Sequence, residues 1–91
     1  MADLTRTDLI KLLAIATQPL KLTGVDLSGV NLNGLDLSYV NLTGANLQKA
    51  SFKDTYLLKT NLSKANLTGA SGMNFSQFNL AHTDGAKGIK F

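Results

Sequence analysis

The sequence predicts an all-β solenoid, in which the chain winds around an axis in short straight segments separated by corners. A large apolar residue occupies every fifth position over ten consecutive repeats, at Leu22, Leu27, Leu32, Leu37, Leu42, Leu47, Phe52, Leu57, Leu62 and Leu67. A second series, two residues earlier in each repeat, holds smaller side chains such as Val25, Ala45 and Thr55. A period of five fits neither the 3.6-residue α-helix nor the two-residue strand. We therefore expect both series to point toward a common axis.

The residues between the apolar positions supply the corners. The residue before each large apolar one is usually Asp or Asn, and the residue after it is often Ser or Thr. Glycine commonly follows, at Gly24, Gly29, Gly34, Gly44 and Gly69. Short polar side chains bond to nearby backbone groups and glycine permits unusual φ angles, so this composition is typical of tight turns.

This repeat resembles that of the pentapeptide-repeat family, whose consensus is Ala, then Asp or Asn, then Leu, then any two residues. Close matches occur at 25–29 (Val-Asp-Leu-Ser-Gly), 45–49 (Ala-Asn-Leu-Gln-Lys) and 65–69 (Ala-Asn-Leu-Thr-Gly), and the resemblance covers about residues 20–86. It implies a right-handed quadrilateral parallel β-helix with four pentapeptides in each coil. Residues twenty positions apart would then stack in columns along the axis.

One break interrupts the period. After Leu67 the next large apolar residues are Phe75 and Leu80, eight and five positions further on. We therefore expect a short insertion of about three residues near 71–73, which would place Phe75 above Phe52 and Leu80 inside the neighbouring column. A contact between the two phenylalanine rings would add roughly 0.5–1.5 kcal/mol beyond the effect of burial.

The residues before the repeats, 1–19, predict a helical cap. Thr5 and Asp8 have the spacing of a capping box, and apolar residues follow at helical spacing until Pro19. We expect a helix over about residues 6–16 that covers the first coil and shields its unpaired backbone groups.

The β-helix is expected over residues 20–86, and residues 87–91 form a C-terminal tail that is too short for a second lid. Two explanations of the open edge remain. The C-terminal coil pairs end to end with a second copy, an arrangement that the family resemblance supports, or the native chain is longer.

Composition excludes several classes of function. The chain has no cysteine, one histidine and a net charge of +3. For hydrolysis His82 would need partners such as Ser76 and Asp84, and the repeat offers no pocket for them. We therefore expect no enzyme activity, no catalytic residue, no cofactor and no metal site.

The charge and hydropathy patterns also limit the partners. The lysines are spread as a belt around the coil rather than gathered in a patch, so we do not expect nucleic acid as a partner. The sequence has no apolar run of the roughly 20 residues that span a bilayer and no signal-peptide pattern. We therefore expect a cytoplasmic protein without a membrane anchor.

The residues most typical of a binding site lie on the fourth side of the coil, the side formed by the fourth pentapeptide of each coil. Outward positions there should be polar, yet Tyr56 and Leu58 flank the inward Leu57. Aromatic residues are enriched in binding hot spots, so we expect a partner-binding face unless the inserted segment or the tail covers it. The column that begins at Tyr39 is expected to continue through Lys59 and His82. The candidate residues of this face are therefore Tyr39, Tyr56, Leu58, Lys59 and His82.

These observations favour a non-catalytic protein–protein interaction or scaffold module whose partner is unidentified. A rigid coil presents its side chains at little entropic cost on binding. The alternative, implied by the family resemblance, is a DNA mimic that modulates type II topoisomerase. That role needs a dense acidic surface in place of phosphates, and a chain with six acidic residues and a net charge of +3 does not provide one.

Overall fold

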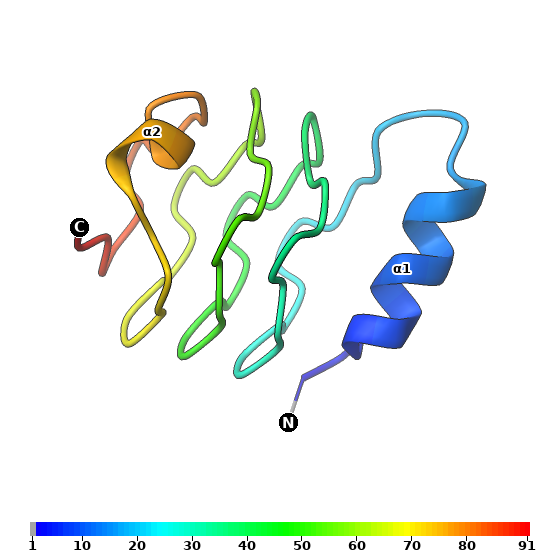
Figure 1. Cartoon of the computed structure of the whole chain (residues 1–91), viewed down its shortest axis with the longest axis horizontal. Helices are drawn as coiled ribbons and strands as arrows, with labels where there is room; N and C mark the ends of the chain where they lie inside the picture. The colour runs from blue at the N-terminus through cyan, green and yellow to red at the C-terminus, as the bar shows by residue number, and fades with distance from the viewer. Residues whose placement is uncertain (1) are drawn as a thin grey trace.

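The computed structural model describes residues 2–91 as a coil with a helix across one end (Figure 1). Helix α1 (Arg6–Ile15) lies against the first coil, and the one-turn helix α2 (Phe75–Phe78) lies at the opposite end. The chain winds steadily from α1 toward α2, and the C-terminus lies at the α2 end. The two helices therefore mark the two ends of the solenoid.

Successive coils are joined by single parallel bridges between residues twenty positions apart. Lys21 pairs with Asn41, Asn41 pairs with Asn61, and Asp36 pairs with Tyr56. Because the sequence period is five, each coil contains four pentapeptides. Every bridge is one residue long, so residues 2–91 contain the pairing of a parallel β-helix without extended strands. The right-handed sense of winding stays a prediction.

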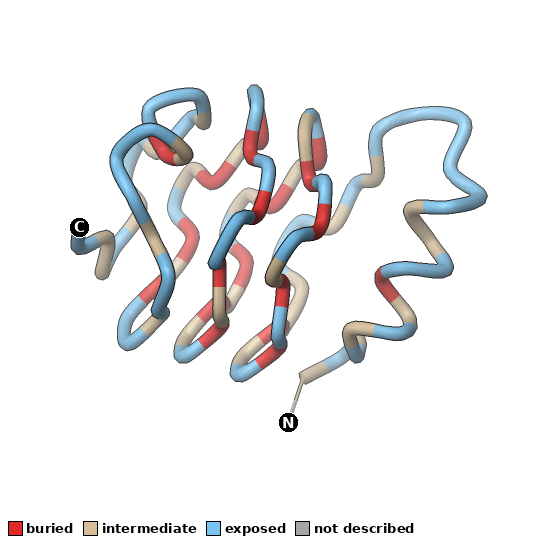
Figure 2. Tube along the Cα trace, in the orientation of Figure 1, coloured by how far each residue is buried: buried red, intermediate tan, exposed pale blue. Residues whose placement is uncertain are grey.

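The two inward series fill the interior of the coil, where the buried residues gather in Figure 2. The large apolar residues of the second coil are 0–2% exposed: Leu42, Leu47, Phe52 and Leu57. Thr55 and Thr60 occupy smaller inward positions and are also buried. The Thr55 hydroxyl donates to the Leu32 carbonyl oxygen at 2.8 Å. The Thr60 hydroxyl donates to the Leu37 carbonyl oxygen at 2.7 Å. Both buried hydroxyls therefore have the hydrogen-bond partner that a buried polar group requires.

The corners combine a side-chain hydrogen bond with a left-handed residue. Asn41 Oδ1 accepts the Thr43 backbone N–H at 3.0 Å and the Thr43 hydroxyl at 2.7 Å. The next residue has a positive φ, and five such residues are not glycine: Tyr39, Lys49, Asp54, Lys59 and Lys64, with φ between 55° and 67°. A non-glycine residue in this region costs about 1–2 kcal/mol. The bridges on both sides of each corner hold it there.

Helix α1 begins at the predicted capping box and covers the first coil. The Asp8 backbone N–H donates to Thr5 Oγ1 at 3.1 Å, and the Thr5 backbone N–H donates to Asp8 Oδ2 at 2.9 Å. The Thr5 backbone N–H, followed by the Thr5 side chain, lowers the pKa of the Asp8 carboxyl. Leu9 is fully buried in the core. The Arg6 side chain donates to the Asn31 carbonyl oxygen at 2.9 Å, which fixes the helix to the coil.

The break in the repeat is a helix with a net insertion of one residue, so the insertion of about three residues predicted near 71–73 is wrong. Ser71 still pairs with Ser51, twenty positions away, whereas His82 pairs with Asn61, twenty-one positions away. The chain between these bridges contains α2. A helix advances about 1.5 Å per residue and a strand about 3.3 Å, so the helical detour leaves the next coil nearly in register.

Phe78, and not Phe75, packs against Phe52. The rings of Phe52 and Phe78 meet edge to face with centroids 5.5 Å apart, and Phe78 is buried. Phe75 is 63% exposed and contacts Phe91, and Leu80 is 52% exposed instead of lying in the neighbouring inner column. The five-residue rule assumes the extended repeat. It fails in α2, where helical geometry determines which aromatic ring reaches the axis.

Candidate functional site

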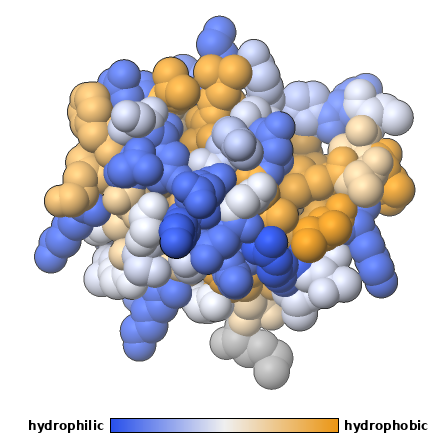
Figure 3. Space-filling view, in the orientation of Figure 1, coloured by the Kyte–Doolittle hydropathy of each residue, from blue (hydrophilic) through white to orange (hydrophobic). Residues whose placement is uncertain are grey.

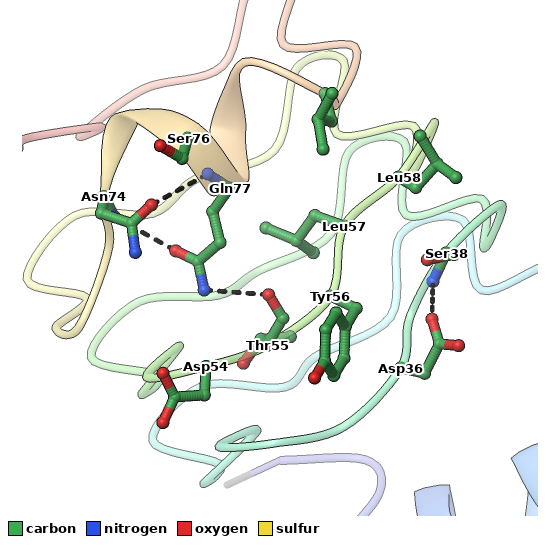
Figure 4. Close-up of a pocket in the computed structure, with 11 residues that line it drawn as sticks. Asp36, Ser38, Asp54, Thr55, Tyr56, Leu57, Leu58, Asn74, Ser76 and Gln77 are labelled. Carbon is green, nitrogen blue, oxygen red and sulfur yellow. Dashed lines mark hydrogen bonds between the residues drawn. The ribbon is translucent and has the colours of Figure 1, made fainter.

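The fourth side of the coil carries an open groove with a volume of about 700 Å³ (Figure 4). The residues that line it come from two successive coils and from the segment around α2, which meet there. The lining residues are Asp36, Ser38, Asp54, Thr55, Tyr56, Leu57, Leu58, Asn74, Ser76, Gln77 and Leu80.

Large apolar side chains form one part of the groove. Tyr56 stands directly above Asp36 in the column of bridges and is 64% exposed. Leu58 is 40% exposed, and Leu80, from the next level, is 52% exposed. The Lys59 backbone N–H donates to the Leu80 carbonyl oxygen at 2.7 Å, which ties this part of the chain to the coil beneath. The groove thus exposes an aromatic ring and two leucines on the same side.

Two carboxylates lie on either side of the Tyr56 ring in Figure 4. Asp36 Oδ1 accepts the Ser38 backbone N–H at 3.0 Å. The Ser38 side chain, followed by its backbone N–H, lowers the pKa of Asp36, so this carboxyl is ionised at neutral pH. Asp54 is exposed at a left-handed corner, with φ of 59°. No lysine, arginine or histidine is among the residues that line this groove, although the chain as a whole carries +3.

Gln77 fixes α2 to the edge of the groove. Its Nε2 donates to the Phe52 carbonyl oxygen at 2.6 Å and to the Thr55 carbonyl oxygen at 2.9 Å. Its Oε1 accepts the Asn74 backbone N–H at 3.1 Å, and Asn74 Oδ1 accepts the Gln77 backbone N–H at 2.9 Å. The α2 wall of the groove is therefore held by hydrogen bonds to the core coil as well as by packing.

The structure groups four of the five residues predicted for the partner-binding face. Tyr56 and Leu58 line the groove, while Tyr39 and Lys59 occupy left-handed corners next to it. The Tyr39 backbone N–H donates to the Leu58 carbonyl oxygen at 2.9 Å. The segment around α2 leaves Tyr56 64% exposed, so it does not cover this face.

The predicted position of His82 above the Tyr39 column is wrong. His82 pairs with Asn61, which belongs to the column of Lys21 and Asn41 on the first side of the coil. The misplacement follows from the register, because the prediction assumed about three inserted residues and the structure has a net insertion of one. His82 is exposed at its actual position.

Sequence reasoning missed most of the residues that line the groove, among them Asp36, Asp54 and Gln77. The spacing of twenty residues already places Asp36 beneath Tyr56, so the column rule contained that signal. Asn74 and Gln77 also have the spacing of a capping box, which could have identified α2. Asp54 is the one acidic residue among the non-glycine left-handed corners of residues 2–91, but its place at the groove becomes visible only in the folded coil.

Across residues 2–91 there is no group of three or more histidine, cysteine, aspartate or glutamate residues that could hold a metal ion. No helix in the same range has the length and hydropathy needed to cross a membrane. Figure 3 shows apolar side chains in separate patches, at both ends of the molecule and in the upper part between them, with hydrophilic side chains around these patches.

Comparisons with known proteins address the repeat rather than the groove. A family model of pentapeptide repeats matches in 8 copies, over residues 21–55 and 36–80. A search of curated proteins finds no match. Among solved structures, the chain is similar to the crystal structure of a pentapeptide repeat protein from the thylakoid lumen of Arabidopsis thaliana, with 25% identity and a TM-score of 0.32. The similarity covers 77% of this chain and 62% of that one, so it spans less than two thirds of that protein.

Proposed function

The chain belongs to the pentapeptide-repeat family, and we propose that it is a non-catalytic protein–protein interaction module that binds its partner through the fourth side of the coil. The pair Tyr56 and Leu58 carries this proposal. These large side chains are 64% and 40% exposed at positions where most repeats have Asp or Asn and Ser or Thr. Exposed aromatic and aliphatic side chains grouped in a hollow are typical of binding hot spots.

The backbone around this pair supports a binding role because it is already fixed. The Tyr56 N–H donates to the Leu35 carbonyl oxygen, and the Tyr56 carbonyl oxygen accepts the Leu37 N–H, both at 2.9 Å. Leu57, between the two exposed residues, is 2% exposed and anchors them to the core. A partner would therefore lose little free energy in ordering this surface.

An affinity capture from native cell extract tests the proposal. The wild type is compared with a triple variant, Tyr39→Ser, Tyr56→Ser and Leu58→Ser. The matched control replaces exposed apolar residues elsewhere, Ile10→Ser and Ile15→Ser on α1, which are 44% and 76% exposed. We expect a protein that the wild type and the control capture and the triple variant loses.

Equal capture by all three proteins would refute the proposed face. Topoisomerase subunits captured equally by all three would instead favour the DNA-mimic alternative. The low acidity of the chain argues against that alternative, since six acidic residues are set against nine lysines and arginines.

We also propose that a second copy pairs end to end at the C-terminal coil. Support comes from Phe75 and Phe91 at that end, which are 63% and 65% exposed and whose ring centroids lie 5.9 Å apart. Sedimentation equilibrium of the wild type and a Phe75→Ser variant tests this proposal. A dimer that the substitution weakens is expected, and a wild type that stays monomeric at high concentration would contradict it.

A further inference from the structure

We infer that the groove on the fourth side recognises a peptide segment in which a lysine or arginine lies one or two positions from an aliphatic residue. This inference rests on the proposed function and adds the chemistry of the partner. It is carried by the charge of the groove, by the position of Tyr56 and by the two exposed leucines.

The charge of the groove is opposite to that of the whole chain. Asp36 and Asp54 line it and no cationic residue does, whereas the net charge of the chain is +3. Asp36 uses Oδ1 to accept the Ser38 N–H, and its side chain is exposed, so a ligand can reach the carboxylate. A cationic side chain is the complement that this arrangement favours.

Tyr56 makes the carboxylate pair more selective. Its ring lies between Asp54 and Asp36 in Figure 4 and is 64% exposed. A guanidinium or ammonium group over an aromatic face gains a cation–π attraction, and a guanidinium can also stack on the ring while it bonds to a carboxylate. A cation stacked on the ring would therefore have a carboxylate on either side of it.

The leucines determine the neighbouring residue of the ligand. Leu58 and Leu80 are 40% and 52% exposed and line the same groove. An aliphatic side chain close to the cation in sequence would bury them on binding. Asn74 and Ser76, also in the lining, offer polar groups to the backbone of the bound segment. A peptide with both side chains fits the groove better than a free amine, which would leave the leucines exposed.

The test is a selection of random displayed heptapeptides on the immobilised full chain, followed by affinity measurements of the selected peptides by fluorescence anisotropy. The acidic variant is Asp36→Asn with Asp54→Asn. It should fold. Asparagine already occupies the positions equivalent to Asp36, at Asn31 and Asn41, and at Asp54 asparagine tolerates the left-handed corner. Asp84→Asn, an exposed acid outside the groove, is the control.

We expect the selected peptides to be rich in lysine or arginine close to an aliphatic residue and to bind the wild type and the control equally. An exposed ion pair changes an equilibrium constant by up to about fivefold, so the double Asn variant should bind more weakly by about fivefold. Selected peptides that are neutral or acidic, or that bind the double Asn variant as tightly as the wild type, would overturn the inference.

A further variant, Tyr56→Ser with Leu58→Ser, separates this inference from the proposed function. Peptides that lose affinity for this variant but not for the double Asn variant would leave the binding face in place and reject the cationic ligand. Peptides that bind this variant as tightly as the wild type would reject both.

Discussion

Two glycines with the same backbone conformation are expected to respond differently to replacement by alanine. Gly34 and Gly72 both have φ of 73°. A Cβ atom added at Gly34 would meet no heavy atom within 4 Å, whereas one added at Gly72 would lie 2.6 Å from the Lys53 backbone nitrogen and 3.0 Å from the Lys53 Cα. The two substitutions therefore share one energetic penalty and differ in a second.

The shared penalty is conformational. An alanine in the left-handed region costs about 1–2 kcal/mol, and its lower entropy in the unfolded chain returns about 0.4–1 kcal/mol. We expect Gly34→Ala to lower the free energy of unfolding by about 1 kcal/mol. The coil tolerates this penalty already, since residues such as Lys59 occupy the same region.

Gly72→Ala adds a steric penalty, because its Cβ would meet backbone atoms of the coil beneath that cannot rotate away. Forced repacking of this kind costs about 1–3 kcal/mol, so we expect a total loss of about 2–4 kcal/mol. Urea unfolding followed by circular dichroism measures both variants. Equal losses for Gly34→Ala and Gly72→Ala would refute the close approach of the two coils at Lys53.

Two further predictions concern the core and the corners. Phe78→Ala should lower the free energy of unfolding by about 3–5 kcal/mol, the usual loss when a buried phenylalanine is replaced by alanine. Phe75→Ala removes an exposed ring and should lower it by less than about 1 kcal/mol in the same urea assay. Similar losses for the two variants would mean that Phe75, and not Phe78, is the buried ring. Side-chain and backbone bonds from the following serines lower the folded pKa values of Asp26 and Asp36 below the unfolded value of 3.8. The stability that these carboxylates contribute is thus present above about pH 4 and lost as the pH falls through the folded pKa. Stability measured from pH 6 to pH 2 should fall less in an Asp26→Asn, Asp36→Asn variant than in the wild type, and parallel curves would contradict this assignment.

The regular part of the fold was predictable because one rule governs it. The same five-residue period that places Leu42 and Leu47 inside also sets the spacing of twenty between Lys21 and Asn41. The rule fails between Ser71 and His82, where α2 replaces the extended repeat. Periodicity alone cannot give the residue count that a helical detour absorbs.

The candidate site was predictable only in part, for a related reason. Tyr56 and Leu58 stand out within the repeat because apolar residues occupy polar positions. The acidic character of the groove depends on Asp36, one coil below, and its far wall depends on Gln77 in the irregular segment. Such a surface becomes visible only when the coils are stacked in their actual register.

Photo-crosslinking from the groove tests the central claim most directly. A photoreactive phenylalanine analogue replaces Tyr56 in one protein and Lys21 in another, since Lys21 is exposed and occupies the same place in the repeat on the first side of the coil. Both proteins are irradiated in native cell extract. The proposed function predicts a discrete cross-linked partner from position 56 that is absent from position 21. The same partners from both positions, or a partner from position 21 alone, would contradict the assignment of the fourth side as the binding face.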